Sequence, residues 1–425
     1  MRGGLGMVFL LGTAWLFSLN RRSISWQLVW RGLALQLVFA FIVLKTGAGR
    51  AFFSTVNDVL VAMVNYTNAG SSLLFGALTS PAVPVDGGDG GSVLIGAHFA
   101  FGVLTAIIFF SSFMAVVYHL GVMQRVVGGM AWLMKRTLGT SGAETTSAAG
   151  NIFFGQTEAP LLVRPFIAKM TDSELNTVMT GGFATVAGGA MAGYVAILSG
   201  AFPGIAGHLL AASIMAAPAG IVVSKMLAPE TRRSESADGV QVQVKTDYAN
   251  VIDAAAGGAG DGMKLTLNVA ASLLAFMALI AMMNGMLGWA TNLVGFEPLT
   301  LEQVFGWVFA PIAWVIGVPW SDAVSVGTLF GVKMVANEFV AFAQFGDALS
   351  GGAPAAGTVM TEKGRLICAY ALTGFANFSS IAIQIGGIGG IAPDRRSDLA
   401  RLGLRAMLGG TAATWMTATL AGAIA

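Results

Sequence analysis

A polar segment at residues 150–160 interrupts a chain that otherwise has the character of consecutive membrane spans. It places Asn151, Gln156 and Glu158 among glycines and a proline, residues that break helices. A polar group at bilayer depth is costly and is rarely present there without a function. Irregular backbone is tolerated at that depth only where protein or a water-filled cavity shields it. The segment therefore predicts a broken or re-entrant element that holds a polar ligand.

The composition indicates a membrane protein. Hydrophobic residues make up 55% of the chain and charged residues only 10%, whereas soluble domains carry about 25% charged residues. The 57 glycines suit close helix packing. A net charge of +2 is too small to indicate a nucleic-acid partner. The single cysteine, Cys368, excludes a disulfide framework and a cysteine-rich metal site.

Apolar runs predict eight membrane spans, and amphipathic runs between them predict helices that lie along the interface. The predicted spans are residues 4–19, 26–44, 93–118, 175–199, 205–226, 265–292, 366–391 and 403–423. The predicted interfacial helices are residues 51–76, 121–138 and 300–320, and residues 228–261 are predicted to be a charged, soluble loop.

Polar segments near residues 141–169 and 322–346 are predicted to enter and leave the membrane on the same side, as re-entrant hairpins. With that arrangement most lysines and arginines fall on one side, as the positive-inside rule requires. If either segment instead crossed the membrane once, the orientation of every later span would be reversed. The charge distribution therefore favours hairpins.

The chain repeats this pattern in its second half. Glu158 is followed by the polar break at residues 180–185, and Glu338 is followed by a similar break at residues 373–380. Paired interruptions in two inverted halves indicate a transporter site near the membrane midplane. Ordinary helix packing explains most of the glycines. It does not explain the polar side chains in these apolar surroundings, which are Gln156, Glu158, Glu338, Asn377, Ser379 and Ser380.

Four motifs in this order resemble the concentrative nucleoside transporter family, in its bacterial and sodium-coupled branch. The motifs are residues 155–162, 179–184, 337–341 and 374–382. The resemblance implies an all-α polytopic membrane protein with eight transmembrane helices, two re-entrant helical hairpins and interfacial helices. It also implies an inverted repeat, in which each half contains a hairpin and an interrupted helix, and a homotrimer embedded in membrane lipid.

The resemblance also implies how the chain is divided. Residues 1–118 are expected to be mainly scaffold helices, and residues 263–298 a further scaffold helix. Residues 119–262 are expected to form the first repeat of a mobile transport domain. Residues 299–425 are expected to contain an interfacial helix and the second repeat. The mobile part would move as an elevator.

The function implied is import of nucleosides such as uridine or adenosine by sodium symport across the bacterial cytoplasmic membrane. No organic cofactor, nucleic-acid partner or enzyme activity is expected. Residues matching the family's nucleobase contacts are Gln156, Thr157 and Glu158; those matching its ribose contacts are Glu338, Asn377 and Ser380, with Phe375 against sugar and base. The expected sodium ligands are the side chains of Asn151 and Thr185 and the backbone carbonyls of Phe154 and Val186.

Three alternatives stay open from the residues themselves. A proton-coupled nucleoside or nucleobase carrier would use titration of Glu158 or Glu338. A membrane enzyme would need a nucleophile with a base, but the polar motifs contain no histidine; a channel would need a continuous polar pore. Tyr194 is expected either to reach the ligand or to pack in the core with a satisfied hydroxyl.

Overall fold

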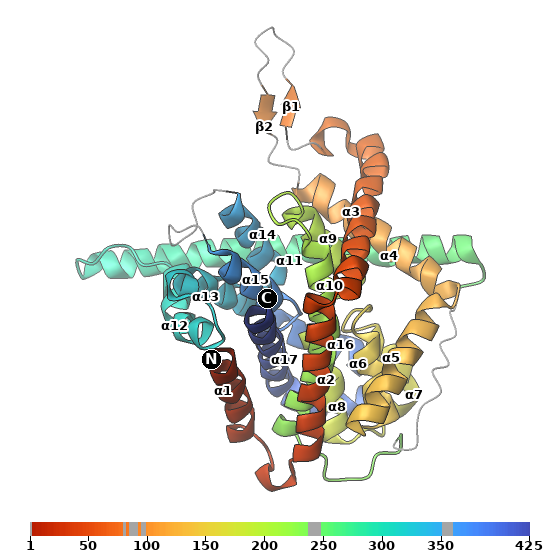
Figure 1. The fold of residues 1–425 in the computed structure, drawn as a ribbon. Coiled ribbons are helices and arrows are strands. Elements are labelled where there is room, and N and C mark those ends of the chain that lie inside the picture. The colour runs from red at the N-terminus through yellow and green to blue at the C-terminus, as the bar shows by residue number, and fades with distance from the viewer. Residues whose placement is uncertain (1, 80–81, 85–91, 95–98, 237–247, 351–359) are drawn as a thin grey trace.

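The computed structural model describes residues 2–79, 82–84, 92–94, 99–236, 248–350 and 360–425 (Figure 1). Helices dominate, as the sequence predicts. The described part also contains two short strands, β1 (Ala82–Pro84) and β2 (Ser92–Leu94), which pair antiparallel. The all-α prediction therefore holds except for this three-residue pairing.

The helices of the first half run from α1 to α10. They are α1 (Arg2–Leu16), α2 (Trp26–Lys45), α3 (Gly47–Phe75), α4 (Leu104–His119), α5 (Val122–Leu138), α6 (Gly142–Gly150), α7 (Arg164–Ile167), α8 (Asp172–Ala184), α9 (Gly188–Leu198) and α10 (Ile205–Leu227). The helices of the second half are α11 (Val251–Leu293), α12 (Leu301–Val315), α13 (Trp320–Val335), α14 (Glu338–Leu349), α15 (Glu362–Leu372), α16 (Phe378–Ile391) and α17 (Arg396–Ile424). Short turns of other helix types are η1 (Arg21–Ser23), η2 (Gly76–Thr79), η3 (Phe99–Val103), η4 (Ala159–Val163) and η5 (Pro393–Arg395).

Five helical segments of the described chain are long and apolar enough to cross a membrane. They are Trp26–Lys45, Ala100–His119, Asp172–Leu198, Ile205–Leu227 and Val251–Leu293. Three shorter helices, α1, α12 and α16, are also apolar. The total of eight spans stays a prediction. Two of the expected spans, residues 175–199 and 366–391, are each divided into two helices, at the breaks that the polar motifs predict.

Helix α11 corrects the prediction for residues 228–261. It begins at Val251, because the side chain of Asn250 accepts hydrogen bonds from the backbone N–H groups of Ile252 and Asp253. The expected loop is therefore helical from residue 251; residues 237–247 lie outside the described chain. At 43 residues α11 is roughly 65 Å long, and it runs roughly perpendicular to the direction of α2, α10 and α17 (Figure 1).

The predicted interfacial helix at residues 300–320 is also shorter than expected. Helix α12 ends at Val315, and Gly317 adopts φ = +114°, a conformation that favours glycine. Pro319 then precedes α13, which begins at Trp320. Trp320 therefore belongs to the next helix. Residues 51–76 and 121–138 fold as the predicted helices α3 and α5.

Two helix–turn–helix segments, called hairpins 1 and 2 below, lie at the positions of the predicted re-entrant hairpins, and that they re-enter the membrane stays a prediction. Hairpin 1 comprises α6, the turn at residues 151–158, η4 and α7; hairpin 2 comprises α13 and α14, joined by residues 336–337. Each precedes an interrupted helix, α8/α9 or α15/α16. A Cβ atom on Gly374, whose φ is +95°, would lie 2.6 Å from the carbonyl oxygen of Phe183. The two interrupted helices therefore meet at their breaks.

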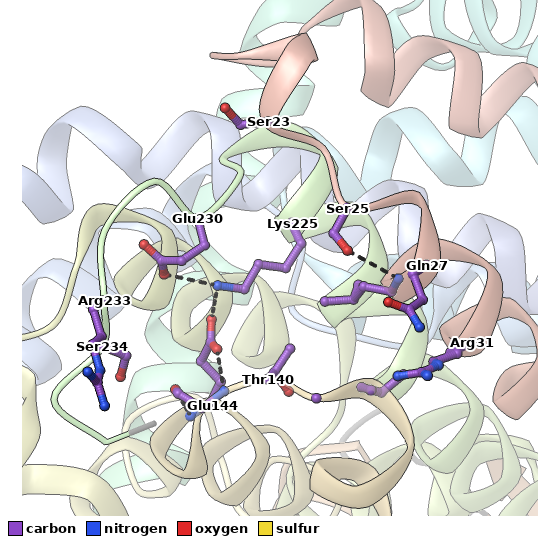
Figure 2. A pocket seen from close by; sticks show the side chains of 14 residues that line it. Ser23, Ser25, Gln27, Arg31, Thr140, Glu144, Lys225, Glu230, Arg233 and Ser234 are labelled. Atoms are coloured by element: carbon purple, nitrogen blue, oxygen red, sulfur yellow. Dashed lines mark hydrogen bonds and ion pairs between the residues drawn. The ribbon is translucent and has the colours of Figure 1, made fainter. Parts of the chain in front are cut away.

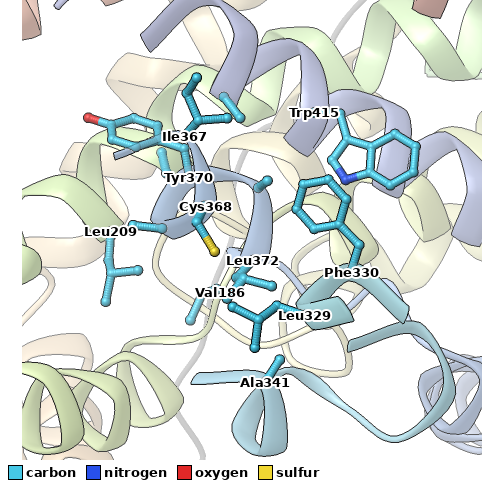
Figure 3. Packing of buried hydrophobic residues seen from close by; sticks show 14 of the residues in the cluster. Val186, Leu209, Leu329, Phe330, Ala341, Ile367, Cys368, Tyr370, Leu372 and Trp415 are labelled. Atoms are coloured by element: carbon cyan, nitrogen blue, oxygen red, sulfur yellow. The ribbon is translucent and has the colours of Figure 1, made fainter. Parts of the chain in front are cut away.

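A hydrophobic cluster joins the two halves beside these breaks (Figure 3). Val186 of the first break packs in the same cluster as Leu372 at the end of α15. Phe330 of α13 stacks on Trp415 of α17, with ring centroids 5.3 Å apart. This packing holds the α8/α9 break and hairpin 2 in one core, which fixes the positions of the polar groups.

Candidate substrate and ion site

Four of the predicted ligand residues form one hydrogen-bonded chain. Gln156 at the tip of hairpin 1 donates through Nε2 to Ser380 Oγ at 3.1 Å. The backbone N–H of Ser380 donates to Asn377 Oδ1 at 2.8 Å, which caps α16. Asn377 Nδ2 in turn donates to Glu338 Oε2 at 2.7 Å. The structure therefore connects the two hairpin tips through the N-terminus of α16.

Tyr194 of α9 completes the surroundings of Glu338. Its hydroxyl donates to Glu338 Oε1 at 3.1 Å, and its ring stacks on Phe342 with centroids 4.6 Å apart. Tyr194 is fully buried and Glu338 is 4% exposed. Of the two expectations for Tyr194, the structure has core packing with a satisfied hydroxyl. That hydroxyl also orients a predicted ligand residue.

Lys333 is a polar residue of this region that the sequence interpretation missed. Its Nζ atom donates to the carbonyl oxygens of Ala371 and Thr373, each at 2.9 Å, and the residue is 3% exposed. These carbonyls lie at the C-terminal end of α15, where a helix leaves acceptors unpaired and favours positive charge. The available signal was a lysine five residues before Glu338 in an apolar helix.

Gln384 was missed as well. It is fully buried on α16, and its Nε2 donates to Gln156 Oε1 at 3.0 Å and to the carbonyl oxygen of Met179 at 3.1 Å. Its position four residues after Ser380 places both on one face of α16. That spacing could have been recognised from the sequence.

The other predicted ligand residues lie beside this chain. Thr157 Oγ1 donates to Glu158 Oε1 at 3.1 Å, and Glu158 is exposed. Thr157 packs against α16, because a Cβ atom on Gly387 would lie 2.5 Å from its Cγ2. Phe375 is half-buried, and its carbonyl accepts a hydrogen bond from the N–H of Asn377 at 2.9 Å.

The residues predicted to bind sodium surround the α8/α9 break. Asn151 is fully buried, and neither atom of its amide has a hydrogen-bond partner within the described residues. A Cβ atom on Gly181 would lie 3.1 Å from Asn151 Nδ2, and Thr185 Oγ1 donates to the Gly181 carbonyl at 2.9 Å. Asn151 and Thr185 are therefore neighbours at this glycine.

The two backbone positions of the predicted ion site lie in the same region. The carbonyl of Phe153, next to Phe154, accepts from the N–H of Gly188 at 3.1 Å. Val186 is fully buried in the break. The Phe154 ring points elsewhere and makes an edge contact with Tyr118, with centroids 5.1 Å apart. Neutral amide, hydroxyl and carbonyl oxygens suit a hard monovalent cation, so the donor set fits sodium.

A cavity of about 420 Å³ lies at the base of hairpin 1 and not at the hairpin tips (Figure 2). There Lys225 of α10 forms ion pairs with Glu144 of α6 and, at 3.3 Å, with Glu230. Glu144 also accepts from the backbone N–H of Ser141 at 3.0 Å. These contacts hold the base of hairpin 1 against α10, whereas the predicted ligand residues of this hairpin lie at its tip.

Two hairpins and two interrupted helices whose polar tips converge are typical of secondary transporters. The comparisons with known proteins agree. Residues 5–78 match the N-terminal and residues 208–422 the C-terminal model of the Na+ dependent nucleoside transporter family, and residues 100–201 match a nucleoside-recognition Gate model. The chain belongs to this family of sodium-dependent nucleoside transporters, which are integral membrane proteins and not enzymes.

Several relatives and solved structures are similar over nearly the whole chain. The uncharacterised transporter YutK of Bacillus subtilis is 45% identical over 99% of this chain and 98% of its own length. Mouse sodium/nucleoside cotransporter 1 is 40% identical over 95% of this chain, and the matched region covers 61% of that longer protein. CNTnw in an inward-facing, substrate-bound state is 43% identical, with a TM-score of 0.88 over 100% of this chain and 97% of that one. A CNTnw variant in an outward-facing state also gives 0.88, at 42% identity and the same coverage.

Proposed function

We propose that this protein imports nucleosides by sodium symport across the cytoplasmic membrane of a bacterium. The observation that carries the proposal is the hydrogen-bonded chain from Gln156 through Ser380 and Asn377 to Glu338. The Asn151 amide, which has no partner within the described residues, lies on the tip of hairpin 1 beside it. Glu338 and Asn377 together offer oxygen acceptors and amide donors that suit the vicinal hydroxyls of ribose. Gln156, Thr157 and Glu158 offer donors and acceptors for a nucleobase edge, and the Phe375 ring an apolar face for sugar and base.

The proposed coupling between sodium and nucleoside depends on the tip of hairpin 1, which carries residues of both proposed sites. Asn151 and Thr185, with the carbonyls of Phe154 and Val186, form the proposed ion site, and Asn151 lies in the same turn as Gln156. An ion that orders this turn also orders the base-binding side chains. Because coupling between two sites is reciprocal, nucleoside should raise sodium affinity by the same factor by which sodium raises nucleoside affinity.

The transport cycle is proposed to be alternating access of the elevator type. Residues 119–262 and 299–425 would form the mobile domain, with residues 1–118 and 263–298 as scaffold. Eight spans, two re-entrant hairpins and a homotrimeric assembly in the lipid bilayer complete this proposal. A membrane potential of 100 mV supplies about 2.3 kcal/mol per sodium ion, and a tenfold sodium gradient about 1.4 kcal/mol more. Together they would support roughly 500-fold accumulation of nucleoside.

The test is uptake of radiolabelled uridine by proteoliposomes that contain the purified protein. Uptake is expected only with an inward sodium gradient, and it should be unaffected by an imposed pH gradient. Uptake that ignores sodium but follows pH would reject sodium coupling in favour of the proton-coupled carrier. Uptake of free uracil in place of uridine would reject the ribose contacts.

A further inference from the structure

Gln384 makes contacts that the proposed transport cycle does not explain. It extends from α16 of the second repeat to α8 and to the hairpin 1 tip of the first repeat. Its Nε2 donates to the carbonyl oxygen of Met179 at 3.1 Å and to Gln156 Oε1 at 3.0 Å. An amide nitrogen carries two hydrogens, so both are used.

These contacts fix which way the Gln156 amide faces. The oxygen and nitrogen of a side-chain amide are distinguished by their hydrogen-bond partners. The Met179 carbonyl can only accept, so Gln384 must turn its nitrogen toward it. The same nitrogen faces Gln156, which must therefore turn its oxygen toward Gln384. Gln156 consequently presents its NH₂ group on the opposite side, where it donates to Ser380 Oγ at 3.1 Å.

The local packing leaves little room for another arrangement. Gln384 is fully buried and Gln156 is 7% exposed. A Cβ atom on Gly182 of α8 would lie 2.8 Å from Gln156 Cβ and 2.9 Å from Gln384 Nε2. Both amides thus lie directly against the bare backbone of α8. Turning Gln156 over would place its NH₂ group against the NH₂ group of Gln384, and turning Gln384 as well would place its amide oxygen against the carbonyl oxygen of Met179.

We propose that Gln384 is a positioning residue that sets the base preference of the transporter through Gln156. This rests on the proposed function, in which Gln156 and Glu158 face the nucleobase. Gln156 then offers a donor, and the carboxylate of Glu158, which already accepts from Thr157 Oγ1, offers an acceptor. The complementary edge has a carbonyl oxygen beside a ring N–H, as in uracil, hypoxanthine and guanine. Cytosine and adenine present an amino group beside an unprotonated ring nitrogen, so both contacts are mismatched.

The wild-type protein tests the preference directly. Unlabelled uridine, inosine, cytidine and adenosine are each titrated against sodium-driven uptake of radiolabelled uridine into proteoliposomes. Uridine and inosine are expected to compete at least about tenfold better than cytidine and adenosine, because two hydrogen bonds are lost with the latter pair. Equal competition by all four would overturn the role of Gln384 and leave nucleoside transport standing. Failure to take up any nucleoside would overturn the proposed function and this proposal with it.

The variant Gln384→Met tests whether the base preference depends on this residue. Methionine has a similar length but no donor, so Gln156 can turn and the uridine-to-cytidine preference should fall toward one. A purely structural role would lower uptake of every nucleoside equally and leave the ratio unchanged, which would contradict the proposal. The matched control is Gln124→Met: Gln124 also donates through Nε2 to a main-chain carbonyl, that of Tyr118 at 2.8 Å, but lies on α5. Its ratio should equal that of the wild type.

Discussion

Each hairpin tip precedes an interrupted helix, but the two tips differ in how their polar groups are satisfied. The tip of hairpin 1 is a long turn, residues 151–158, in which the Asn151 amide has no partner within the described residues. The tip of hairpin 2 is only residues 336–337. There Glu338 accepts from both Tyr194 and Asn377. Within the described residues, the first tip thus leaves the Asn151 amide without a partner, whereas at the second tip protein groups satisfy Glu338.

The adjoining helix breaks differ in the same way. At the second break the Lys333 ammonium donates to the carbonyls of Ala371 and Thr373 at the C-terminal end of α15, so the protein contributes its own cation. At the first break, within the described residues, Thr185 Oγ1 donates to the Gly181 carbonyl, the Val186 N–H donates to Ser213 Oγ, and the Asn151 amide has no partner, so none of these groups contacts a side-chain cation. The second break thus contains a side-chain cation that the contacts of the first break lack within the described residues. Sodium dependence is therefore expected to reside in the first repeat alone.

The largest expected effect comes from Lys333→Met, which removes the built-in cation. It leaves the Ala371 and Thr373 carbonyls unpaired in a buried position, so the free energy of unfolding should fall by about 2–5 kcal/mol. Chemical or thermal unfolding in detergent measures this. Sodium half-saturation of the remaining uptake should stay unchanged. The control is Lys363→Met on the exposed face of α15. A raised sodium half-saturation in Lys333→Met would show that the second break also contributes to sodium binding and would contradict the proposed difference between the two breaks.

The second prediction concerns the ribose contacts of the second tip. Glu338→Gln replaces one acceptor oxygen by an NH₂ donor; the remaining oxygen can still accept from Asn377, but one acceptor for the ribose hydroxyls is lost, so uridine affinity should fall by roughly 10- to 100-fold. The variant should also discriminate less between uridine and its 2′- and 3′-deoxy analogues. Equilibrium binding of the three ligands measures both effects. Wild-type discrimination in Glu338→Gln would contradict the ribose assignment; Glu362→Gln, in an exposed position of α15, is the control.

The sequence predicts the parts of this site that rest on strong local signals. Glycine and polar residues within apolar runs predicted both helix breaks, and asparagines predicted the polar tips, because such residues are costly in apolar surroundings. Gln384 and Lys333 carried the same signal but stood alone between apolar neighbours. Their partners are main-chain carbonyls of distant helices, at Met179, Ala371 and Thr373, and a main-chain acceptor has no signature in the sequence.

The errors in the fold prediction have a related origin. Charged residues between Glu230 and Asp253 indicated a loop as far as residue 261, but the Asn250 cap starts α11 at Val251 and the helix continues into its apolar part. The helix predicted to run to Trp320 ends at Val315, because the conformation of Gly317 was not evident from an apolar pattern. In both regions the hydrophobic pattern described the character of the segment but not its boundaries.

The third prediction tests the first tip. Asn151→Ala removes the unpartnered amide, so sodium half-saturation of uridine uptake should rise by about 5- to 30-fold, the loss of one polar ligand. Uridine binding measured without sodium should be unchanged, because the contacts of Glu338 and Asn377 remain. Asn65→Ala on the exposed part of α3 is the control. Equal loss of sodium-free binding would mean that Asn151 supports the whole site and not the ion.

The smallest expected effect separates the packing of Tyr194 from its hydrogen bond. Tyr194→Phe keeps the ring stacked on Phe342 but removes the donor to Glu338, so uridine affinity should fall by only about 2- to 10-fold. Without this hydrogen bond the Glu338 side chain is less well oriented toward the ribose hydroxyls. The loss of affinity should therefore be larger for uridine than for its deoxy analogues. Tyr370→Phe is the matched control, because Tyr370 is also fully buried and its hydroxyl contacts His208 at 3.2 Å, away from both tips. If both variants bind uridine equally, then Tyr194 acts through packing alone and Glu338 is oriented by Asn377 without it. The second tip would then depend on a single amide, and its difference from the first tip would be smaller than the contacts indicate.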